Sequence, residues 1–291
     1  MRTYLKEFFK IFAFEKEDIK HLLDCYDHIQ AHPQAKALWD KALSIYEFEM
    51  ICDFKLMIDL GMKATQIAGY HFYTGNLLLF CCLSQQLQHY YVNNGIDLKI
   101  YYDTLLDLRY KLEECKTVKG ICGLFVPTWF VGFYTLKRFA LGRLQFEIIP
   151  FGLDYVKDGY SLTQQHKVIN IHIPRTGTPI DQRSCDIAFL RAKEFFAGQW
   201  SNPCTFYCNS WLLFPAHEEI ISHHTNTYKF MKRFEIVKET VDHEGKNLWR
   251  LFDTDEKNPR RLPADTSMRR SYIHYLTQGK HPGCGIGIFF L

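Results

Sequence analysis

Residues 168–214, VINIHIPRTGTPIDQRSCDIAFLRAKEFFAGQWSNPCTFYCNSWLLF, carry the pattern that decides the fold. Residues 168–174 and 205–214 are extended stretches rich in β-branched and aromatic side chains. The turn RTGTP at 175–179 and a helical pattern at 181–199 lie between them. A strand, a loop, a helix and a second strand form a βαβ unit, which predicts two parallel strands joined by a crossover helix.

A third extended stretch, GRLQFEIIP at 142–150, precedes this unit. Side chains of a strand point alternately to opposite faces, so polar side chains at every second position share a face. The polar side chains grouped in this way are Arg143, Gln145 and Glu147 in this stretch, and Asn170 and His172 in the next. A parallel sheet covered on both faces is nearly continuously apolar. The polar face is therefore solvated, or its groups satisfy one another, or it lines a pocket, and the pattern leaves these interpretations open.

The composition limits the class of protein. A length of 291 residues is typical of two domains or one large domain, and a hydrophobic fraction of 47% is ample for a core. The formal net charge of +3 is too small to indicate a nucleic-acid partner, and no block of Lys and Arg occurs. The ten cysteines form no Cys-x-x-Cys pair, which favours buried free thiols in a reducing compartment over disulfides.

No stretch has the pattern of a signal peptide or a membrane span. The N-terminal sequence MRTYLKEFFKIFAFEKED carries charges too often for a signal peptide. The longest apolar stretch, 121–136, has 16 residues and contains Pro127 and two glycines, which is short for a membrane span. We therefore expect a soluble cytoplasmic protein without a membrane partner.

The first part of the chain has apolar residues at the spacing of amphipathic helices. Helices are expected at 15–32, 33–48, 54–60, 70–92 and 101–115. The fourth has a nearly all-apolar centre at 77–83, which indicates a helix buried between others. These residues predict a helical N-terminal domain at 1–126, followed by a second domain at 127–291.

The second domain alternates helices and strands. Helices are expected at 127–142, 181–199, 216–221 and 263–278, and further strands in the later part of 227–241, at 247–252 and at 283–291. The strands before and after the turn at 242–245 would pair antiparallel, and the Gly-rich final strand favours close approach of another backbone. The sequence thus predicts an α+β protein with a helical domain followed by a mixed-sheet α/β domain.

Short motifs in the second half also resemble a known family. They are GRLQFE at 142–147, NIHIPRTG at 170–177, CNSWLL at 208–213 and LPADTS at 262–267, followed by GCGIGIFFL. With these motifs in this order, the chain resembles the bacterial acyltransferase domain-containing family over nearly its whole length. That family joins a helical N-acyltransferase N-terminal domain to a GNAT-like C-terminal domain. The resemblance implies a GNAT-like mixed sheet and an acyl-CoA co-substrate such as acetyl-CoA.

The resemblance also implies a place for the cofactor. The pyrophosphate of acyl-CoA would lie on backbone N–H groups between the central strand and the next helix, whose N-terminus attracts anions. In this sequence the cofactor-binding residues would be Arg175, Thr176, Gly177 and Thr178. The loop departs from the Gln/Arg-x-x-Gly-x-Gly/Ala signature, because it has one glycine and Pro179 removes a donor. The alternative is a tight turn with a helix-starting proline.

Transfer of an acyl group to an amine needs a base for the amine, a donor for the oxyanion and an acid for the leaving thiolate. Glu147 is the first candidate for the base; alternatively, it pairs with Arg143 or another cation. His172 is a second catalytic candidate, because it titrates near neutrality and ends an expected central strand, where open sheets bind ligands. Alternatively, it is a hydrogen-bonded core histidine.

Cys208 and Ser210 are further catalytic candidates, as an acid or, less directly, as a nucleophile. The alternative for Cys208 is a buried structural thiol. A nucleophilic pair of Cys208 and His172 requires neighbouring strands and a shared face. No metal is expected, since the histidine groups lack the spacing of a known site. The histidines weighed as ligands are His28, His32, His217, His223 and His224.

These features predict an acyl-CoA-dependent N-acyltransferase whose acceptor is an amine of a small molecule or peptide. The alternative is a non-catalytic ligand-binding protein that keeps the GNAT-like fold without the cofactor, which the incomplete glycine signature favours. A hydrolase that depends on Cys208 is a third hypothesis.

Overall fold

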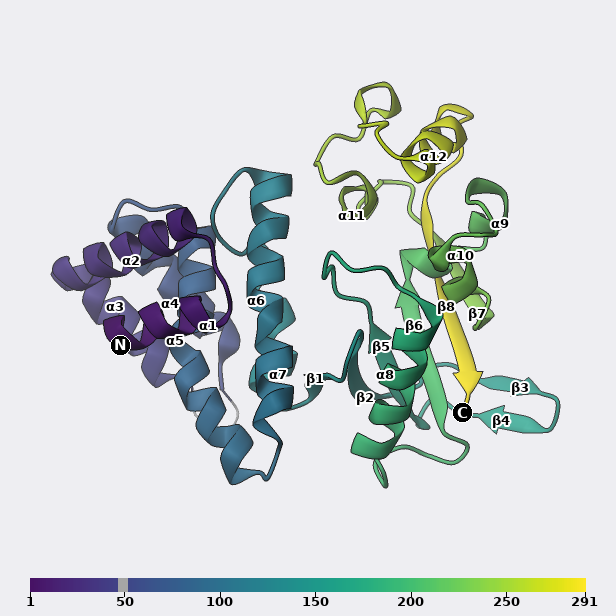
Figure 1. Ribbon diagram of the computed structural model, residues 1–291, viewed down its shortest axis with the longest axis horizontal. Coiled ribbons are helices and arrows are strands. Elements are labelled where there is room, and N and C mark those ends of the chain that lie inside the picture. The colour runs from purple at the N-terminus through teal and green to yellow at the C-terminus, as the bar shows by residue number, and fades with distance from the viewer. Residues whose placement is uncertain (47–51) are drawn as a thin grey trace. The chain divides into compact units, whose positions relative to one another are not determined.

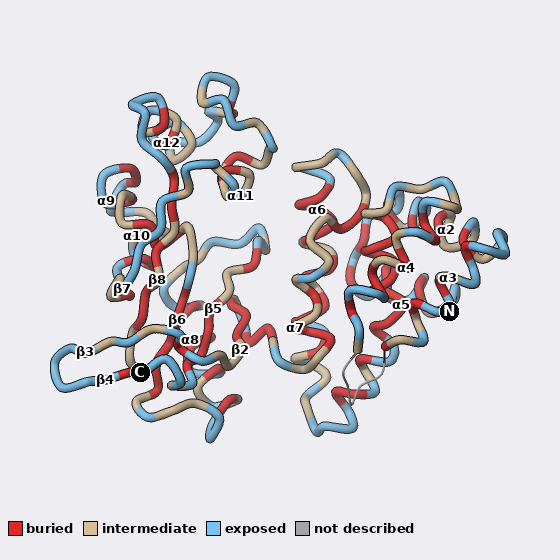
Figure 2. Tube along the Cα trace, turned by 180° about the vertical axis from the view of Figure 1, so that it is seen from behind, coloured by how far each residue is buried: buried red, intermediate tan, exposed pale blue. Residues whose placement is uncertain are grey.

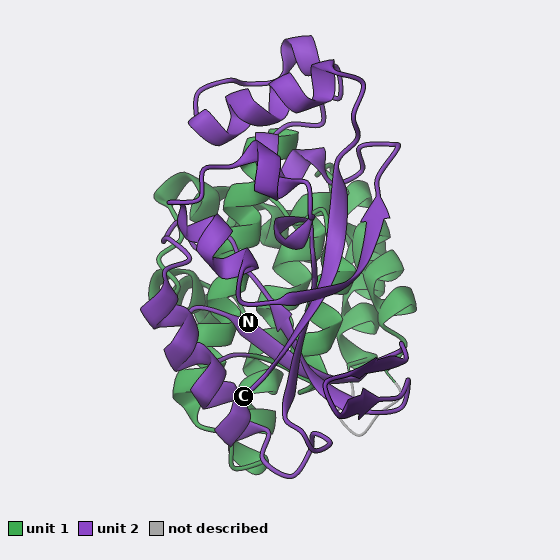
Figure 3. Cartoon of the chain, turned by 90° about the vertical axis from the view of Figure 1, so that its right-hand side faces the viewer, with its two compact units in different colours: residues 1–139 green, residues 140–291 purple. Residues whose placement is uncertain are grey.

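The computed structural model describes residues 1–46 and 52–291 (Figure 1). The chain forms two compact units, Met1–Phe139 and Ala140–Leu291, which we call unit 1 and unit 2 (Figure 3). Unit 1 is built of helices, and unit 2 is built around a mixed sheet with helices. The predicted α+β class, with a helical part followed by a mixed-sheet part, is confirmed.

Unit 1 contains a helix at each place expected between residues 15 and 115, but the helix expected at 127–142 is wrong beyond Tyr134, because Leu136 has φ +52 and Arg138–Ala140 form a strand. Its helices are α1 Arg2–Ile11, α2 Lys16–Ala31, α3 Pro33–Ser44, α4 Phe54–Ile67, α5 Phe72–Asn93, α6 Leu98–Lys119, η1 Pro127–Phe130 and α7 Val131–Tyr134. Pro33 occupies the first turn of α3, where an N–H would have no partner within the helix. The expected end of this helix, Phe48, lies outside the described residues.

Helix α5 carries the central part of the unit 1 core. Residues 77–83 of α5 are all buried, because they are apolar on every side and helices α1 to α4 and α6 pack against α5. Gly95 follows the helix with φ +65, in the left-handed region that favours glycine. Within residues 1–46 and 52–291, no helix combines the length and the apolar character that crossing a bilayer requires.

Unit 2 is organised around a sheet with the strand order β1-β2-β5-β6-β8-β7. The strands are β1 Arg138–Ala140, β2 Gln145–Pro150, β5 Lys167–His172, β6 Thr205–Ser210, β7 Glu235–Val241 and β8 Gly283–Phe290. Strands β5 and β6 are parallel and are joined by α8 Gln182–Phe195, which confirms the predicted βαβ unit. The pairs β2–β5, β6–β8 and β7–β8 are antiparallel.

The strand register separates two faces of the sheet. Glu147 lies opposite Asn170, so their side chains share a face. By the same register, this polar face carries Gln145, Glu147, Asn170, His172, Tyr207 and Asn209. On the other face, the rings of Phe206 and Phe289 stack with centroids 4.9 Å apart, and Phe189 of α8 packs on both. Most of β5 and β6 is therefore buried (Figure 2).

A hairpin that we did not expect from the sequence covers part of the polar face. Strands β3 Tyr155–Lys157 and β4 Tyr160–Leu162 pair antiparallel. Asp158 and Gly159 form the turn, with φ +49 and +82, a conformation for which Asp-Gly is strongly preferred in hairpins. The hairpin contributes to an apolar cluster of Phe151, Leu162, Val168, Tyr207 and Ile288.

The remaining helices of unit 2 are η2 Trp211–Leu213, α9 His217–Ile220, α10 Asn226–Met231, α11 Leu248–Phe252, η3 Pro259–Arg261 and α12 Ser267–Thr277.

The prediction of a strand at 247–252 is wrong, because these residues form helix α11. In a strand, Arg250 would share a face with Leu248 and Phe252 and would be buried with them. The helix buries Leu248 and Phe252 against α12 and leaves Arg250 exposed. Strand β7 accordingly pairs with β8.

The Gly-rich strand β8 approaches its neighbours closely, as the sequence predicts. A Cβ atom on Gly285 would lie 2.1 Å from the carbonyl oxygen of Leu213, and one on Gly287 would lie 2.7 Å from Cβ of Phe234. Real Cβ atoms do not come this near to other heavy atoms, so the segment after β6 can cross this part of β8 because side chains are missing there.

Candidate active site

A compact cluster of polar side chains from β2 and β5 lies on the polar face. Nε2 of His172 lies 2.6 Å from Oε1 of Glu147, and the amide nitrogen of Asn170 lies 3.1 Å from the same oxygen. The side chains of His172 and Glu147 are 19% and 14% exposed. These residues are far apart in sequence, and the antiparallel register of β2 and β5 brings them together.

The donor and acceptor roles in this cluster depend on the tautomer of His172, whose Nε2 also lies 3.1 Å from the amide nitrogen of Asn170. A carboxylate only accepts hydrogen bonds, so with Glu147 ionised the Nε2–H of His172 donates to it. The amide of Asn170 donates to the same carboxylate oxygen. A neutral His172 in this tautomer carries its lone pair on Nδ1. An imidazole oriented by a carboxylate is the arrangement of a general base.

Gln145 adds an unsatisfied acceptor beside this cluster. It lies opposite His172 in the register and is 2% exposed. Its Oε1 accepts no hydrogen bond from the residues that the structure describes. A buried acceptor without a donor costs about 1–3 kcal/mol, which a ligand with an N–H group would recover.

The parallel pair is open at the end where His172 lies. The register of β5 and β6 covers two positions, and the last of them joins Asn170 to Tyr207. Strand β5 continues to His172 and strand β6 to Ser210. The carboxyl ends of the two strands are therefore not paired with each other, and ligands of open α/β sheets bind at such ends.

Arg143, which precedes β2, holds the loop that follows β5. Its guanidinium donates to three carbonyl oxygens: from Nη1 to Pro174 at 3.0 Å, from Nη2 to Thr178 at 3.0 Å and from Nε to Pro179 at 3.2 Å. At the tip of the loop, the hydroxyl oxygens of Thr176 and Thr178 lie 2.7 Å apart. Gly177 between them has φ +76, which only glycine adopts without strain.

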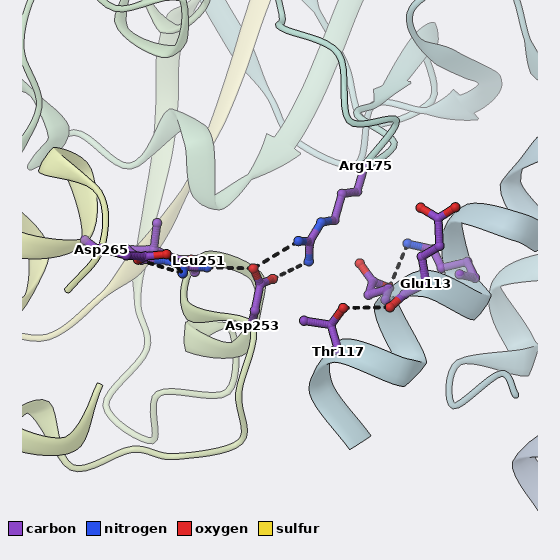
Figure 4. A network of polar contacts seen from close by, with 9 residues as sticks. Glu113, Thr117, Arg175, Leu251, Asp253 and Asp265 are labelled. Carbon is purple, nitrogen blue, oxygen red and sulfur yellow. Dashed lines mark hydrogen bonds and ion pairs between the residues drawn. The ribbon is translucent and has the colours of Figure 1, made fainter. Parts of the chain in front are cut away.

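Arg175 connects the same loop to an ionic network (Figure 4). Its guanidinium pairs with the carboxylate of Asp253, with Nη2 2.9 Å from Oδ2. Arg269 of α12 binds that carboxylate at 2.6 Å and the carboxylate of Asp265 at 2.9 Å. It also donates to the carbonyl oxygen of Leu251 at 2.9 Å. The loop after β5 is thus fixed to the C-terminal helices of unit 2.

Helix α8 begins directly after this loop. Asp181 is its N-cap, and its carboxylate accepts from the backbone N–H of Ser184 at 2.9 Å and from the Ser184 hydroxyl at 2.7 Å. These hydrogen bonds hold the pKa of the Asp181 carboxyl below its usual value. The cap stabilises a helix start whose first N–H groups have no helical partner.

Cys208 and Ser210 do not join this cluster. They share the face of Phe206, opposite to the face of His172. Cys208 is fully buried, and desolvation raises the pKa of its thiol. The hydroxyl of Ser210 accepts a hydrogen bond from the Leu212 backbone N–H at 3.2 Å and caps η2. The nucleophilic pair of Cys208 and His172 requires a shared face, which the register excludes.

The described ranges, 1–46 and 52–291, contain no group of three or more His, Cys, Asp and Glu side chains placed to hold a metal ion. The histidines weighed as ligands have other contacts. His32 caps α3, His28 packs edge-on against Tyr70, and His217 bonds to the carbonyl oxygen of Leu212.

Two residues around the loop were not recognised from the sequence. Arg143 was weighed only as a partner of Glu147, and its contacts with the loop carbonyls, 31 to 36 residues away, were not predicted. Asp253 was not considered, and it meets Arg175 across 78 residues. Neither contact has a local sequence signal, because both depend on tertiary packing.

Two family models together match nearly the whole chain. The family model described as GNAT-like C-terminal domain matches residues 138–289, and the model described as N-acyltransferase N-terminal domain matches residues 3–136. No curated protein matches the sequence.

Several solved structures share the fold at low identity. One is an acyltransferase mutant in complex with octanoyl-CoA, with a TM-score of 0.79 and 17% identity, covering 98% of this chain and 87% of that chain. A second, in complex with decanoyl-CoA and teicoplanin, has a TM-score of 0.77, 17% identity and the same coverage of 98% and 87%. A third, in complex with CoA and 10C-Teicoplanin, has a TM-score of 0.66, 17% identity and 99% coverage of both chains.

Proposed function

The chain belongs to the family that joins an N-acyltransferase N-terminal domain to a GNAT-like C-terminal domain, and from this premise we propose that it transfers an acyl group from acyl-CoA to an amine. The observation that carries the proposal is the contact of 2.6 Å between His172 and Glu147, beside the open end of the parallel strands. An oriented imidazole there can remove the proton that an amine loses when it attacks a thioester.

In this proposal His172 is the base and Glu147 is a positioning residue. Nδ1 of His172 would take the proton from the acceptor nitrogen. Glu147 would hold the opposite Nε2–H and stabilise the imidazolium that forms, and Asn170 would keep the carboxylate in place. This order of roles differs from our expectation of Glu147 as the base, because the carboxylate is already engaged by two donors.

The proton transfers of the reaction can be written with His172 alone. The amine nitrogen attacks the thioester carbonyl, a C–N bond forms, and the C–S bond to CoA breaks. The nitrogen loses one proton to His172, and the CoA thiolate gains one from the resulting imidazolium. Backbone N–H groups of β5 or β6 beyond the last paired position would meet the oxyanion. The products are an amide and free CoA.

The donor would approach from the loop that follows β5. Three similar structures hold octanoyl-CoA, decanoyl-CoA or CoA. In this chain Arg175, Thr176, Gly177 and Thr178, together with the start of α8, would receive the pyrophosphate. The hydroxyl groups of the two threonines lie 2.7 Å apart at the loop tip, so one donates to the other and the second can donate to a phosphate oxygen.

The acceptor would be an amine of a small molecule or peptide. The unsatisfied Oε1 of Gln145 supports this class, because an amine brings N–H groups to the neighbourhood of His172. Two of the similar structures contain teicoplanin or 10C-Teicoplanin beside the donor, which makes compounds of that kind the first to include in a screen. We place the enzyme in the cytoplasm, since its ten cysteines form no disulfide.

The first test measures donor binding and turnover. Titration calorimetry of the purified protein with acetyl-CoA and decanoyl-CoA should show binding, and an amine screen should then detect release of the CoA thiol. His172→Gln should lower kcat by about 10²- to 10⁴-fold, the usual contribution of a general base. Glu147→Gln keeps the shape but removes the charge, so it should lower kcat with little change in donor affinity.

Cys208→Ala is the matched control, because Cys208 lies on the opposite face and should not affect kcat. Unchanged kcat in His172→Gln would reject the assigned base. Donor binding without turnover of any amine would favour the alternative of a non-catalytic ligand-binding protein. A folded protein that binds no acyl-CoA would reject the proposed donor.

A further inference from the structure

We propose that Arg143 is a positioning residue for the donor: it binds carbonyl oxygens of the loop at 174–179 and thereby turns the N–H groups of Arg175 and Ile180 toward the diphosphate of acyl-CoA. This inference rests on the proposed function, which supplies the diphosphate. Arg143 lies before β2, outside the loop and outside any glycine signature.

The direction of the N–H groups follows from the bonded carbonyls. In a trans peptide the C=O and the N–H point in nearly opposite directions. Arg143 binds the carbonyl oxygen of Pro174 at 3.0 Å, so the N–H of Arg175 points away from the guanidinium. It binds the carbonyl oxygen of Pro179 at 3.2 Å, so the N–H of Ile180 points away in the same manner. Two other N–H groups are bonded within the loop, that of Thr176 to the carbonyl oxygen of Pro174 at 3.1 Å and that of Thr178 to the Thr176 hydroxyl at 3.3 Å.

A loop that binds an anion must turn its carbonyl oxygens away, because their partial negative charge repels phosphate. Glycine-rich loops achieve this by backbone conformations that other residues avoid. Between 174 and 180 this chain has a single glycine, Gly177. The third bonded carbonyl, that of Thr178 at 3.0 Å, precedes Pro179, which has no N–H to offer. The guanidinium of Arg143 thus orients these carbonyl oxygens, which glycines do in a glycine-rich loop.

The geometry also explains why arginine is needed at position 143. Its Nη1, Nη2 and Nε hold three oxygens from both ends of the loop, which requires donors in a fixed planar fork. A lysine ammonium is a single centre and cannot reach all three oxygens in that arrangement. On the far side, the ion pair of Arg175 with Asp253 fixes the loop to α11 and α12.

The experiment compares two ligands that differ at the diphosphate. Pantetheine has the thiol arm of CoA but lacks the nucleotide and its phosphates, so the ratio of the two dissociation constants reports the contribution of that part of CoA, and a change of the ratio on mutating Arg143 reports the contribution of the loop. We expect wild-type protein to bind CoA more tightly than pantetheine. Arg143→Gln should reduce this ratio by about tenfold or more, with unchanged affinity for pantetheine. Arg143→Lys should give an intermediate ratio.

Arg191→Gln is the control, because it removes the same charge from the exposed side of α8. It should keep the wild-type ratio. A folded Arg143→Gln protein with the wild-type ratio would overturn the role of Arg143 and leave the proposed function intact. Wild-type protein that binds CoA no better than pantetheine would reject phosphate binding by this loop, and the role of Arg143 with it. If Arg143→Gln does not fold, the ratio of Arg143→Lys decides: a wild-type ratio overturns the proposal and a reduced one supports it.

Discussion

His217 lies among the aromatic rings of Trp211, Phe214 and Tyr272, with its ring 0% exposed. Its Nδ1–H donates to the carbonyl oxygen of Leu212 at 3.2 Å, and Nε2 has no partner among the described residues. Burial opposes the charged form and lowers the pKa of His217 from 6.5 to about 4. The histidine is therefore neutral in the folded protein over most of the acidic range.

This pKa predicts a pH dependence of stability. As the pH falls below 6.5, the unfolded chain binds a proton at this position, whereas the folded protein does so only near pH 4. The free energy of unfolding should therefore decrease between these values, by roughly 3 kcal/mol from this group. Guanidinium unfolding at pH 4.5 and pH 7.5 measures the difference. His217→Phe should reduce it, and an equal difference in that variant would contradict the explanation.

Individual site residues were partly accessible from the sequence. The alternation in β2 and β5 placed Glu147, Asn170 and His172 on polar positions of their strands. Their mutual contact depends on the register of two antiparallel strands, with the hairpin between them, which periodicity does not determine. The role of Arg143 depends on packing between segments more than thirty residues apart and has no local pattern.

Among the elements, those with strong periodicity were predicted well. The unit β5-α8-β6 followed from two extended runs and a helical pattern, because a crossover of this length favours parallel strands. The hairpin of β3 and β4 was missed although Asp158-Gly159 is a strong hairpin signal. Helix α11 was mistaken for a strand, because five residues are too short for their period to distinguish the two.

Strand β8 leads to a prediction at this scale. Gly285→Ala would place a Cβ 2.1 Å from the carbonyl oxygen of Leu213, so η2 or β8 must move. We expect a loss of about 3 kcal/mol in the free energy of unfolding, the upper part of the range for overpacked sites. Chemical denaturation measures this loss. Cys284→Ala in the same strand adds no volume and should have a smaller effect; equal stability of Gly285→Ala and wild type would show that the close approach is not required.

At the scale of the molecule, each of the two units has its own buried core. None of the ten cysteines forms a disulfide, and most are buried in these cores. Burial raises the pKa of Cys25 and Cys115 to about 12 and that of Cys185 to about 11. Such thiols carry little thiolate at neutral pH and are poor nucleophiles. The sequence predicted this state from the absence of Cys-x-x-Cys pairs.

The thiols provide a test of the whole fold. At pH 7.5, Ellman's reagent should react quickly with far fewer than ten thiols in the native protein and with all ten in guanidinium. The partly exposed Cys52, Cys122 and Cys284 should react first. A reducing agent should leave the melting temperature unchanged, since no disulfide is broken. Fast labelling of Cys208 in the native protein would contradict its burial and would support a role as a nucleophile.

The three bonds from Arg143 have a consequence for how this loop changes during evolution. The conformation of the loop at 174–179 depends partly on the side chain at position 143, which lies on a different segment of the chain. Relatives that replace this arginine should therefore regain glycines in the loop, and relatives that keep it should tolerate variation there. We expect the two positions to covary in an alignment of the family, and searches that rely on a glycine motif to overlook members built in this way.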